Sequence, residues 1–350
     1  MKGLILCAGK GTRLQPFSYS QPKTLLPVAN KPVLQYCLEN LLKNGIREIG
    51  IVIHPTQDSI PKLIGNGERY GVSVSYIHQV EQKGISHAVK QAEEFINGEP
   101  FILLLGDNLI AEDLGTLIES FQRDENNGAI LLSPVPNPQE FGIAEIKGTD
   151  IIGLEEKPQK PKSNLAVIGA YLFDPLIFTA VNSIRPSARG EFEITDAIQW
   201  MIDQGHSITY TITRKLYSDV GTVERWLEAN QWMMEKELDD QIILGKHTVV
   251  ENCTLVGPVM IGENCVLRNC VIGPYVSIQD QGTIENCRID HSILLEKAVI
   301  RDLQYPISKS VFGREAHLIG SGDDAKTYHH FYLGDKTKIN MKRDQGDSSD

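Results

Sequence analysis

The sequence of 350 residues predicts an α/β domain followed by a β-helix domain. In the first two thirds, short apolar runs alternate with segments of helical periodicity, which is typical of a mostly parallel sheet covered by helices. From Ile242 onward, glycine and asparagine punctuate short β-branched runs, and apolar residues recur six positions apart. A chain of this length is long for one core, so two domains are expected. The boundaries that we predict are 1–240, 241–340 and a disordered polar tail at 341–350.

The helices and strands of the first domain are predicted from the spacing of apolar residues and from residues that typically begin or end such elements. Buried or alternating runs predict strands at 3–8, 49–53, 72–78, 101–105, 129–134, 141–146, 151–156, 167–173 and 208–212. Helical spacing predicts helices at 31–44, 87–96 and 223–238, and a further helix that begins with Thr195 as its N-cap. We expect a long loop at 55–71, which holds three glycines, and a turn at 217–222. Together these elements predict a Rossmann-like sheet with helices on both faces.

The second domain shows a hexapeptide repeat with single-residue slips. Apolar residues recur at Leu255, Ile261 and Leu267, and a second register continues through Val266, Ile272, Ile278 and Ile284. Each six-residue unit forms one side of a triangular coil, and stacked coils bury the apolar positions, which predicts a left-handed parallel β-helix ending near Val311. Four Asn-Cys pairs fall within the repeat, and we interpret their cysteines as small residues packed at the corners. The segment after Gly320 looks irregular as far as Phe331.

Composition excludes several classes of function. The net charge of −11 argues against general binding to nucleic acid or to anionic membranes, because both need a basic face. No apolar run is long enough to span a bilayer, and the N-terminus lacks the pattern of a signal peptide, so a cytoplasmic location is expected. The six cysteines form no C-x-x-C pair, which favours reduced thiols without a metal.

The loop after the first apolar run is the first candidate for chemistry. Gly9-Lys10-Gly11-Thr12-Arg13 can bring backbone N–H groups close to a bulky anion, and the guanidinium of Arg13 suits phosphate. Lys23 follows in a proline-stiffened segment. The spacing matches neither the P-loop nor the dinucleotide-binding pattern, and Gly9-x-Gly11 alone is explained as often by an ordinary turn.

Three acidic positions have both a chemical and an ordinary interpretation. Asp107 directly follows a buried strand and could hold Mg²⁺ at the sheet edge, or it could cap its own turn. Glu156 and Lys157 begin a charged, proline-rich segment that is either a solvated loop or part of a pocket. Asp219 could lie at the rim of a pocket. Alternatively, the segment around it could have only a structural role, in which Thr222 caps the next helix.

Longer strings of sequence resemble a known family. The string from Leu6 through Gly-Thr-Arg-Leu to Pro22-Lys23 and Leu-Leu-Pro-Val resembles the signature of sugar-1-phosphate nucleotidylyltransferases. Residues 1 to about 235 resemble the glucose-1-phosphate thymidylyltransferases through six ordered strings, and the hexapeptide domain resembles the long form of that family. The strings cover 9–23, 79–88, 105–108, 154–169, 189–196 and 219–222.

The resemblance implies a role for each matching residue. Nucleotide binding is implied for Leu6, Gly9, Gly11, Thr12, Arg13, Gln79 and Gly84, the last two reading the base. Contacts to glucose 1-phosphate are implied for Asn108, Gly142, Glu156, Lys157, Val167 and Arg189. Mg²⁺ is the implied cofactor, held by Asp107 and Asp219, and Arg13 and Lys23 are the implied catalytic residues. Two positions depart from the family pattern, namely Tyr217-Ser218 in place of a nearby tryptophan and Ile-Ser-His-Ala after Gly84.

The implied reaction joins dTTP and glucose 1-phosphate. The phosphate oxygen of the sugar attacks the α-phosphorus in line and pyrophosphate leaves, so the basic residues mainly offset repulsion between anions. UTP or N-acetylglucosamine 1-phosphate are alternative substrates, since a few contacts decide the base and the sugar. A bifunctional enzyme with acetyltransferase activity, using His291 or His317, and a non-catalytic subunit are further alternatives. The flat sides and open end of the β-helix favour a homo-oligomer.

Overall fold

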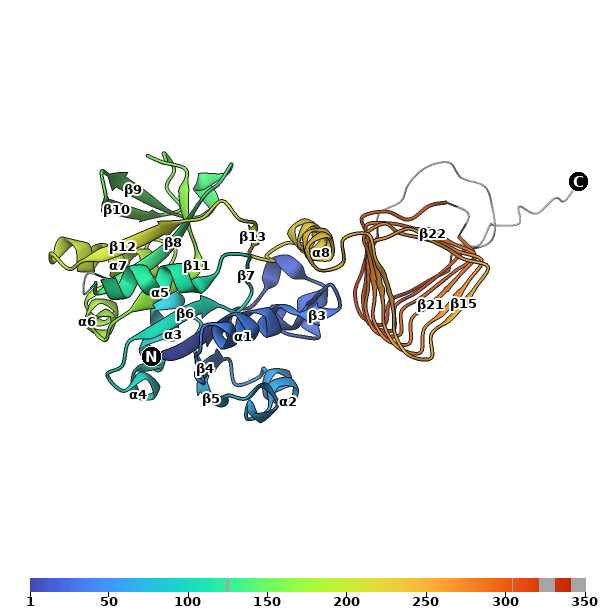
Figure 1. The fold of residues 1–350 in the computed structure, drawn as a ribbon, viewed down its shortest axis with the longest axis horizontal. Coiled ribbons are helices and arrows are strands. Elements are labelled where there is room, and N and C mark those ends of the chain that lie inside the picture. The colour runs from blue at the N-terminus through green and yellow to red at the C-terminus, as the bar shows by residue number, and fades with distance from the viewer. Residues whose placement is uncertain (124–125, 304, 321–330, 341–350) are drawn as a thin grey trace, which may run out of the picture. The chain divides into compact units, whose positions relative to one another are not determined.

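The computed structural model describes residues 1–123, 126–303, 305–320 and 331–340 (Figure 1). By packing, the chain divides into two compact units. The first contains Met1–Lys10 and Val33–Asp219, and the second contains Gly11–Pro32 together with the chain from Val220 onward. This division differs from the predicted boundary at 240, because a segment near the N-terminus packs within the second unit. The domain boundary drawn from motifs therefore stays a prediction.

A nine-stranded sheet forms the centre of the first unit, in the order β10-β9-β11-β6-β1-β4-β5, with β8 beside β11 and β12 beside β8. Strands β6, β1, β4 and β5 run parallel, whereas β11 runs antiparallel to β6, β8 and β9. The predicted Rossmann-like sheet is thus confirmed, and its second half is mixed. The strands are β1 (Lys2–Leu6), β4 (Glu48–Ile53), β5 (Ser73–His78), β6 (Phe101–Leu105), β8 (Gly128–Pro134), β9 (Gly142–Lys147), β10 (Asp150–Glu156), β11 (Leu165–Phe173) and β12 (Ile208–Ile212).

Seven helices of the described chain belong to this unit. A large apolar core joins the sheet to several of them, and it includes Leu4, Leu103 and Ile130 from the strands and Val89 and Ile198 from the helices. Burial of such side chains, at about 25 cal/mol per Å² of apolar surface, is the main force that closes the layers. The helices are α1 (Val33–Lys43), α2 (Ser59–Ile64), α3 (Ile85–Gln91), α4 (Glu93–Ile96), α5 (Leu114–Arg123), α6 (Leu176–Ser183) and α7 (Ile194–Asp203).

Several details of the predicted helices were wrong. The segment 55–71 contains α2, whose buried Ile60 and Ile64 are four residues apart, a weak signal among three glycines. The helix expected at 87–96 is broken at Ala92, whose φ of −93° and ψ of 2° are not helical. Helices α5 and α6 were not predicted. Glu193, rather than Thr195, occupies the N-cap of α7, and the turn expected at 217–222 begins with the short strand β13 (Tyr217–Ser218).

The second unit begins with the segment Gly11–Pro32, which holds β2 (Pro27–Val28) and β3 (Lys31–Pro32). It continues with α8 (Val223–Leu238), where the hydroxyl of the N-cap residue Thr222 accepts a hydrogen bond from the backbone N–H of Arg225. The predicted left-handed parallel β-helix follows and is confirmed. Its coils stack into three parallel sheets, seen as a triangular outline in Figure 1.

The three sheets of the β-helix repeat the same short strands coil after coil. The first contains β14 (Ile242–Leu244), β17 (Val259–Ile261), β20 (Val276–Ile278), β23 (Ile293–Leu294), β25 (Val311–Phe312) and β27 (Tyr332–Leu333). The second contains β15 (Val249–Glu251), β18 (Val266–Arg268), β21 (Thr283–Glu285), β24 (Val299–Arg301), β26 (His317–Ile319) and β28 (Lys338–Asn340). The third contains β16 (Thr254–Leu255), β19 (Val271–Ile272) and β22 (Arg288–Ile289).

The repeat extends further than predicted, since β27 and β28 lie beyond Val311 and pair with the coil before them. Val249, Val266 and Thr283 occupy equivalent positions and are 17 residues apart, as are the asparagines that follow them. A coil of 17 residues is one short of three hexapeptides, which accounts for the slips in the sequence. The predictions for 321–330 and for the tail at 341–350 concern residues outside the described ranges.

Three of the four Asn-Cys pairs have a structural role at one corner of the coils. Asn252, Asn269 and Asn286 adopt positive φ of 51°, 53° and 54°, where asparagine is tolerated better than most residues. The side-chain amide of Asn252 donates to Asn269 over 3.3 Å, and that of Asn269 donates to Asn286 over 3.0 Å. The following cysteines Cys270 and Cys287 are buried, and all six cysteines are free thiols. The sequence predicted the corner packing but not this ladder of amides.

Candidate active site

The carboxyl ends of four parallel strands meet at one edge of the first unit. Leu6 at the end of β1 pairs with Leu105 at the end of β6, and the N–H of Gly106 donates to the carbonyl of Leu6 over 2.9 Å. On the other side, the N–H of Gln79 donates to the carbonyl of Ile53 over 2.9 Å. Ligands of open α/β sheets bind beyond such strand ends, so the edge gathers the predicted positions Leu6, Asp107 and Gln79 as the strand pattern required.

A short strand pair brings the two predicted metal ligands to neighbouring segments. Strand β7 (Leu109–Ile110) pairs with β13, with Leu109 opposite Ser218 and Ile110 opposite Tyr217. Asp107 lies two residues before Leu109, and Asp219 directly follows Ser218. The antiparallel pairing therefore places both carboxylates just beyond the same end of this two-stranded sheet. Tyr217, which stands near the position where the family has tryptophan, packs edge-on against Phe141 with ring centroids 6.3 Å apart.

Asn108 is held between β6 and β7 in a space that only glycine can provide. It is buried, and its side-chain oxygen Oδ1 has no hydrogen-bond partner among the described residues. Gly169 has a φ of +63°, and a Cβ built on it would lie 1.8 Å from the amide nitrogen of Asn108. The irregular register of β11 between Val167 and Tyr171 creates this approach. A buried amide oxygen without a partner is costly unless a ligand supplies the donor.

Two predicted positions, Gly142 and Glu156, form a second cluster together with Thr195, which was predicted only as a helix cap. Gly142 and Glu156 are directly opposite each other in the β9–β10 pair. A Cβ on Gly142 would lie 2.9 Å from Oε2 of Glu156 and 2.5 Å from the methyl group of Thr195, so the site requires glycine. The hydroxyl of Thr195 donates to Oε2 of Glu156 over 3.3 Å. The backbone N–H of the next residue, Lys157, donates a hydrogen bond to the carbonyl of Phe141, and its side chain is exposed. Val167 is buried in β11.

Arg189 is surrounded by three carboxylates. Its Nη1 lies 3.5 Å from Glu156 and 3.4 Å from Glu193, and its Nη2 lies 3.5 Å from Glu191. Burial and then the negative charge of Glu193 raise the pKa of Glu156, although Lys157 and Arg189 oppose the shift. Burial also raises the pKa of Glu193, against the hydrogen bond from Ser187 and the charge of Arg189. These N···O distances are long, so charge holds the guanidinium near the three carboxylates without a tight bidentate bond.

The predicted base-reading residues lie on the loop between β5 and α3. Gln79 is buried, and its amide nitrogen lies 3.2 Å from the carbonyl oxygen of Gly84. Gly84 has a φ of +104°, and a Cβ there would lie 2.6 Å from the backbone oxygen of Phe192. The backbone of Phe192 also bonds Lys83 and Ser86, and the hydroxyl of Ser86 donates to the carbonyl of Glu193 over 2.8 Å. One segment before α7 thus supports both the Gln79 loop and Arg189.

The other signature residues belong to the second unit, where they form a tight loop. Gly11 has a φ of +64° and precedes a short 3-10 turn, Thr12–Leu14. A Cβ on Gly11 would lie 3.2 Å from Cβ of Lys23, so the two ends of the signature are close. Thr12 and Arg13 are exposed and Lys23 is half-buried. This arrangement leaves the side chains of Thr12 and Arg13 accessible to an anion.

Helix α8 and the β-helix hold this signature segment in place. The indole N–H of Trp226 donates to the carbonyl of Pro27 over 2.6 Å, and its ring packs edge-on against Phe17 at 5.3 Å. The side chain of Asn30 donates to the carbonyl of Ile278 over 2.7 Å. Arg314 of the β-helix donates to the side-chain oxygen of Gln21 over 2.8 Å. No sequence pattern indicates these contacts, which link residues more than 190 positions apart.

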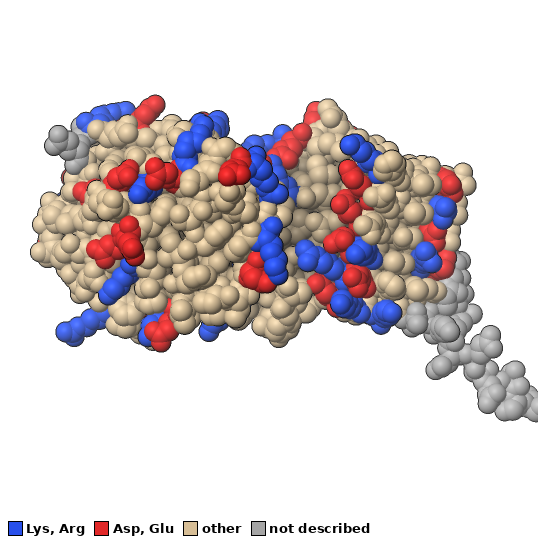
Figure 2. Space-filling view, turned by 90° about the horizontal axis from the view of Figure 1, so that it is seen from below, with Lys and Arg blue, Asp and Glu red and all other residues tan. Residues whose placement is uncertain are grey.

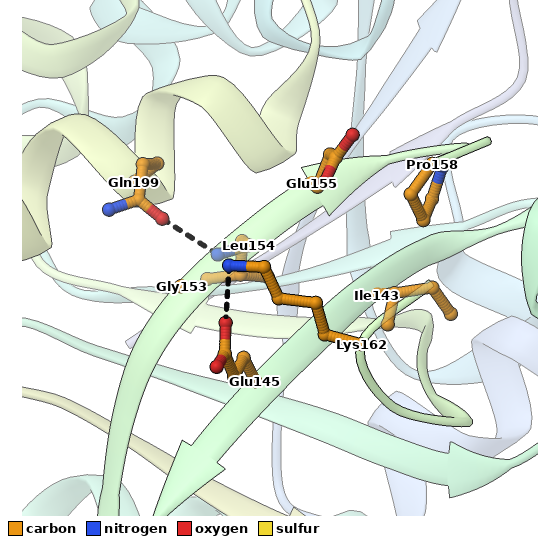
Figure 3. Close-up of a pocket in the computed structure, with 8 residues that line it drawn as sticks. All are labelled: Ile143, Glu145, Gly153, Leu154, Glu155, Pro158, Lys162 and Gln199. Atoms are coloured by element: carbon orange, nitrogen blue, oxygen red, sulfur yellow. Dashed lines mark hydrogen bonds and ion pairs between the residues drawn. The ribbon is translucent and has the colours of Figure 1, made fainter. Parts of the chain in front are cut away.

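A pocket of about 230 Å³ opens on the other side of β10. Figure 3 shows Gln199 of α7 accepting the backbone N–H of Leu154 over 2.7 Å, and Lys162 pairing with Glu145 over 2.9 Å. Glu155 lines this pocket, while its neighbour Glu156 belongs to the predicted site, since successive side chains of a strand face opposite sides. The pocket is therefore separate from the predicted residues, although strands β9 and β10 contribute both to it and to the pair Gly142 and Glu156.

Sequence reasoning missed the residues that support the site. Thr195, Glu193, Ser86 and His87 all contact predicted residues or the segment that carries them. The sequence indicates Thr195 only as a helix cap, and the other three only lie within strings that resemble the family. In the β-helix, His291 has its Nδ1 2.8 Å from Asp290 and its ring 4.9 Å from that of Tyr275. His317 lies in β26 opposite Val299 and Lys338.

The distribution of charged side chains on the surface is consistent with the net negative charge of the sequence. On the face in Figure 2, acidic and basic side chains are interspersed and form no continuous basic area. Within the described ranges, no group of three or more His, Cys, Asp or Glu side chains could by itself hold a metal ion. None of the helices in the described ranges is long and apolar enough to cross a membrane.

Comparison with models of protein families shows which family the chain belongs to. Residues 2–236 match the family model described as nucleotidyl transferase, and this range contains every predicted site residue. The chain belongs to the nucleotidyl transferase family. Its relatives identify it further as an enzyme that acts on a sugar 1-phosphate and a nucleoside triphosphate.

Two relatives and one solved structure illustrate the match. A glucose-1-phosphate thymidylyltransferase of Streptomyces griseus is 36% identical and covers 97% of this chain and 99% of its own. The low-salt glycan biosynthesis nucleotidyltransferase Agl11 of Haloferax volcanii is 41% identical over 74% of this chain and 72% of its own. A crystal structure from Bacillus anthracis, assigned to glucose-1-phosphate thymidylyltransferases and bound to sucrose, is 35% identical. It covers 66% of this chain and 94% of its own, with a TM-score of 0.63.

Proposed function

We propose that the protein transfers a thymidylyl group from dTTP to glucose 1-phosphate, giving dTDP-glucose and pyrophosphate. The observation that supports this most is the alignment over nearly the whole of both chains with the Streptomyces griseus glucose-1-phosphate thymidylyltransferase. That alignment spans the β-helix as well as the catalytic domain, so it distinguishes the long form from relatives that share only the first domain.

The chemistry requires little acid–base catalysis. A phosphate oxygen of glucose 1-phosphate, already ionised at neutral pH, forms a bond to the α-phosphorus of dTTP, and the bond from that phosphorus to the pyrophosphate oxygen breaks. Both substrates are anions, so repulsion and misalignment are the main obstacles. Arg13 and Lys23 are proposed to hold the triphosphate, with Leu6, Gly9, Gly11 and Thr12 at its sugar and phosphates. Gln79 and Gly84 are proposed to read the base.

The sugar phosphate has its own proposed contacts. Arg189 and Lys157 would bind its phosphate, since a guanidinium loosely paired with carboxylates can exchange them for a stronger anionic partner. Glu156 would accept hydrogen bonds from hydroxyl groups of the glucose, supported by Thr195 and unobstructed at Gly142. Asn108, with its unpartnered buried oxygen, would accept another, and Val167 would pack against the ring.

The donors at Asp107 and Asp219 fit Mg²⁺. Hard cations prefer carboxylate oxygens, and Mg²⁺ usually takes one or two carboxylates while phosphates and water complete its shell. Two carboxylates beyond one end of the β7–β13 pair match that pattern. When bound, the ion would neutralise charge on the phosphates.

The test is pyrophosphate release with glucose 1-phosphate and Mg²⁺, comparing dTTP, UTP, dCTP, dGTP and dATP. A clear preference for dTTP is expected. A preference for UTP would keep the reaction and overturn the base assignment. Activity only with N-acetylglucosamine 1-phosphate would overturn the sugar assignment, and release of acetyl groups from acetyl coenzyme A would indicate the bifunctional alternative. The absence of activity in every assay would favour a non-catalytic subunit. The proposal also includes a homo-oligomer and a cytoplasmic location.

A further inference from the structure

The side-chain amide of Gln79 has a fixed orientation. Its Nε2 lies 3.2 Å from the carbonyl oxygen of Gly84 and 3.0 Å from Nδ1 of His87. A carbonyl oxygen can only accept a hydrogen bond, so the amide atom facing Gly84 must be the NH₂ group. The opposite atom, Oε1, receives no hydrogen bond from any described protein group. Gln79 therefore offers a ligand an acceptor and keeps its donors for the protein.

His87 supplies the second acceptor for that NH₂ group. Since Nε2 of Gln79 is a donor, Nδ1 of His87 must be unprotonated, and the neutral ring carries its proton on the other nitrogen. The ring stacks on Phe192 with centroids 6.4 Å apart and an interplanar angle of 29°. Backbone bonds from Phe192 to Lys83 and Ser86 fix that partner in turn. Both amide hydrogens of Gln79 are thus bound by groups that are themselves held.

We propose that His87 is a positioning residue for base recognition, which holds the amide of Gln79 so that Oε1 accepts a hydrogen bond from the N3–H of a pyrimidine base. The inference rests on the proposed function and adds the residue that sets base choice. Thymine and uracil carry a proton on N3, whereas cytosine has a lone pair there. A fixed acceptor attracts the first two bases and repels cytosine, whereas a free amide could rotate and present its NH₂ group to cytosine.

The charges around His87 keep the ring neutral. Burial is the largest cause that lowers its pKa below 6.5, and Lys83 in the preceding loop and Lys90 on α3 act in the same direction. Glu81 opposes them, and Phe192 presents an uncharged aromatic face. The acceptor at Nδ1 is therefore present at neutral pH. When the pH is below the lowered pKa of His87, Nδ1 carries a proton. It is then a hydrogen-bond donor that faces another donor, the NH₂ group of Gln79, and the hydrogen bond between them is lost.

The first test replaces the acceptor and keeps the ring. The ratio of kcat/KM for dTTP to that for dCTP is measured at pH 8 with glucose 1-phosphate. In His87→Phe, which can still pack on Phe192, the ratio should fall roughly tenfold, because one hydrogen bond that orients a buried amide is lost. The KM for glucose 1-phosphate should stay the same. In His87→Gln, whose side-chain oxygen can accept, most of the ratio should return.

The second test follows the wild-type protein over a range of pH, so its main result does not depend on how the variants fold, and His87→Phe serves as the comparison. The dTTP-to-dCTP ratio should fall as the pH is lowered from 8 to 5.5 in the wild type and should stay flat in His87→Phe. Effects on the shared sugar phosphate cancel in the ratio. A pH-independent wild-type ratio, or a ratio that survives in His87→Phe, would overturn the role of His87 alone. A wild type that does not prefer dTTP over dCTP would overturn the proposed function together with it.

Discussion

At the scale of single residues, the predicted positions lie in small clusters in which a glycine makes room for a polar side chain or for the backbone of another segment. Gly142 leaves space for Glu156, Gly169 leaves space for Asn108, and Gly84 leaves space for the backbone of Phe192. In each case a methyl group would collide with the neighbour within 3 Å, so the identity of the residue is dictated by distance. Motif reading could select these glycines, but it could not say what they make room for.

Lys23 is the residue whose loss should reduce catalysis most directly. In Lys23→Ala we expect kcat to fall on the order of 10²-fold, as for the loss of one preorganised charge contact in a transition state. The measurement is steady-state pyrophosphate release with dTTP and glucose 1-phosphate. Lys10→Ala removes an exposed lysine of the same loop and should retain activity. Unchanged turnover in Lys23→Ala would remove that residue from the mechanism.

Glu156 should make the protein less stable as the pH rises. Its pKa is raised in the folded protein above the ordinary value of 4.5, mainly by burial. Below 4.5 the carboxyl is protonated in both states and contributes nothing. Above that pH the carboxyl of Glu156 ionises more readily in the unfolded chain than in the folded protein. The free energy of unfolding therefore falls as the pH rises, until the pH passes the raised pKa. Glu156→Gln should therefore unfold at a higher temperature than the wild type at pH 7, and the difference should vanish near pH 4.

The matched control for this experiment is Glu155→Gln, which changes the exposed neighbour on the other face of β10. Thermal unfolding of that variant should follow the wild type at both pH values. A difference between Glu156→Gln and wild type that is equal at pH 4 and pH 7 would contradict the assignment of a raised pKa. Activity should fall in Glu156→Gln regardless, because the proposed contact to glucose is weakened.

At the scale of elements, the β-helix does more than stack its own coils. Its Arg314 and the coil carbonyl at Ile278 bond the signature segment through Gln21 and Asn30. Trp226 of α8 and Phe17 of the segment pack together, and both are fully buried. A segment that carries Arg13 and Lys23 is thus supported by residues from the second half of the chain. This is a reason for the β-helix to matter to catalysis besides assembly.

Arg314 offers a test of that support. Arg314→Ala leaves the buried side-chain oxygen of Gln21 without its donor, which loosens the segment leading to Lys23. We expect kcat to fall about three- to tenfold, as for the loss of one hydrogen bond of about 1 kcal/mol, with the circular dichroism spectrum unchanged. Arg268→Ala is the control, because that guanidinium bridges Glu251 and Glu285 within the coils. Equal effects of the two substitutions would mean that the β-helix acts only through its own stability.

At the scale of the whole molecule, the first coil of the β-helix leaves apolar side chains in water. Ile242, Ile243, Leu244 and Val249 are 41%, 41%, 47% and 38% exposed. Each later coil covers the equivalent positions of the coil before it, whereas the first has a neighbour on one side only. Clustered apolar exposure of this kind favours association with a second copy of the chain.

Leu244→Lys should weaken that association. Analytical ultracentrifugation is expected to show an oligomer for the wild type and a shift toward smaller species for the variant, because a charge at the contact must be desolvated. Ile212→Lys is the matched control, since Ile212 is 45% exposed in the first unit and lies far from the first coil in sequence. A monomeric wild type, or an unchanged distribution in Leu244→Lys, would contradict association through this coil.

The class of fold, the order of the two architectures and the family could all be predicted from the sequence, because strand and hexapeptide periodicities and the signature strings are local patterns. The sequence also placed Leu6, Asp107 and Gln79 at strand ends, since parallel strands end at a common edge. Which side chains contact one another became clear only from the folded chain. Thr195 bonds Glu156 instead of capping its helix, Ser86 and His87 support the base loop, and Arg314 reaches Gln21. These contacts join distant segments through burial and hydrogen bonding, and no local pattern records them.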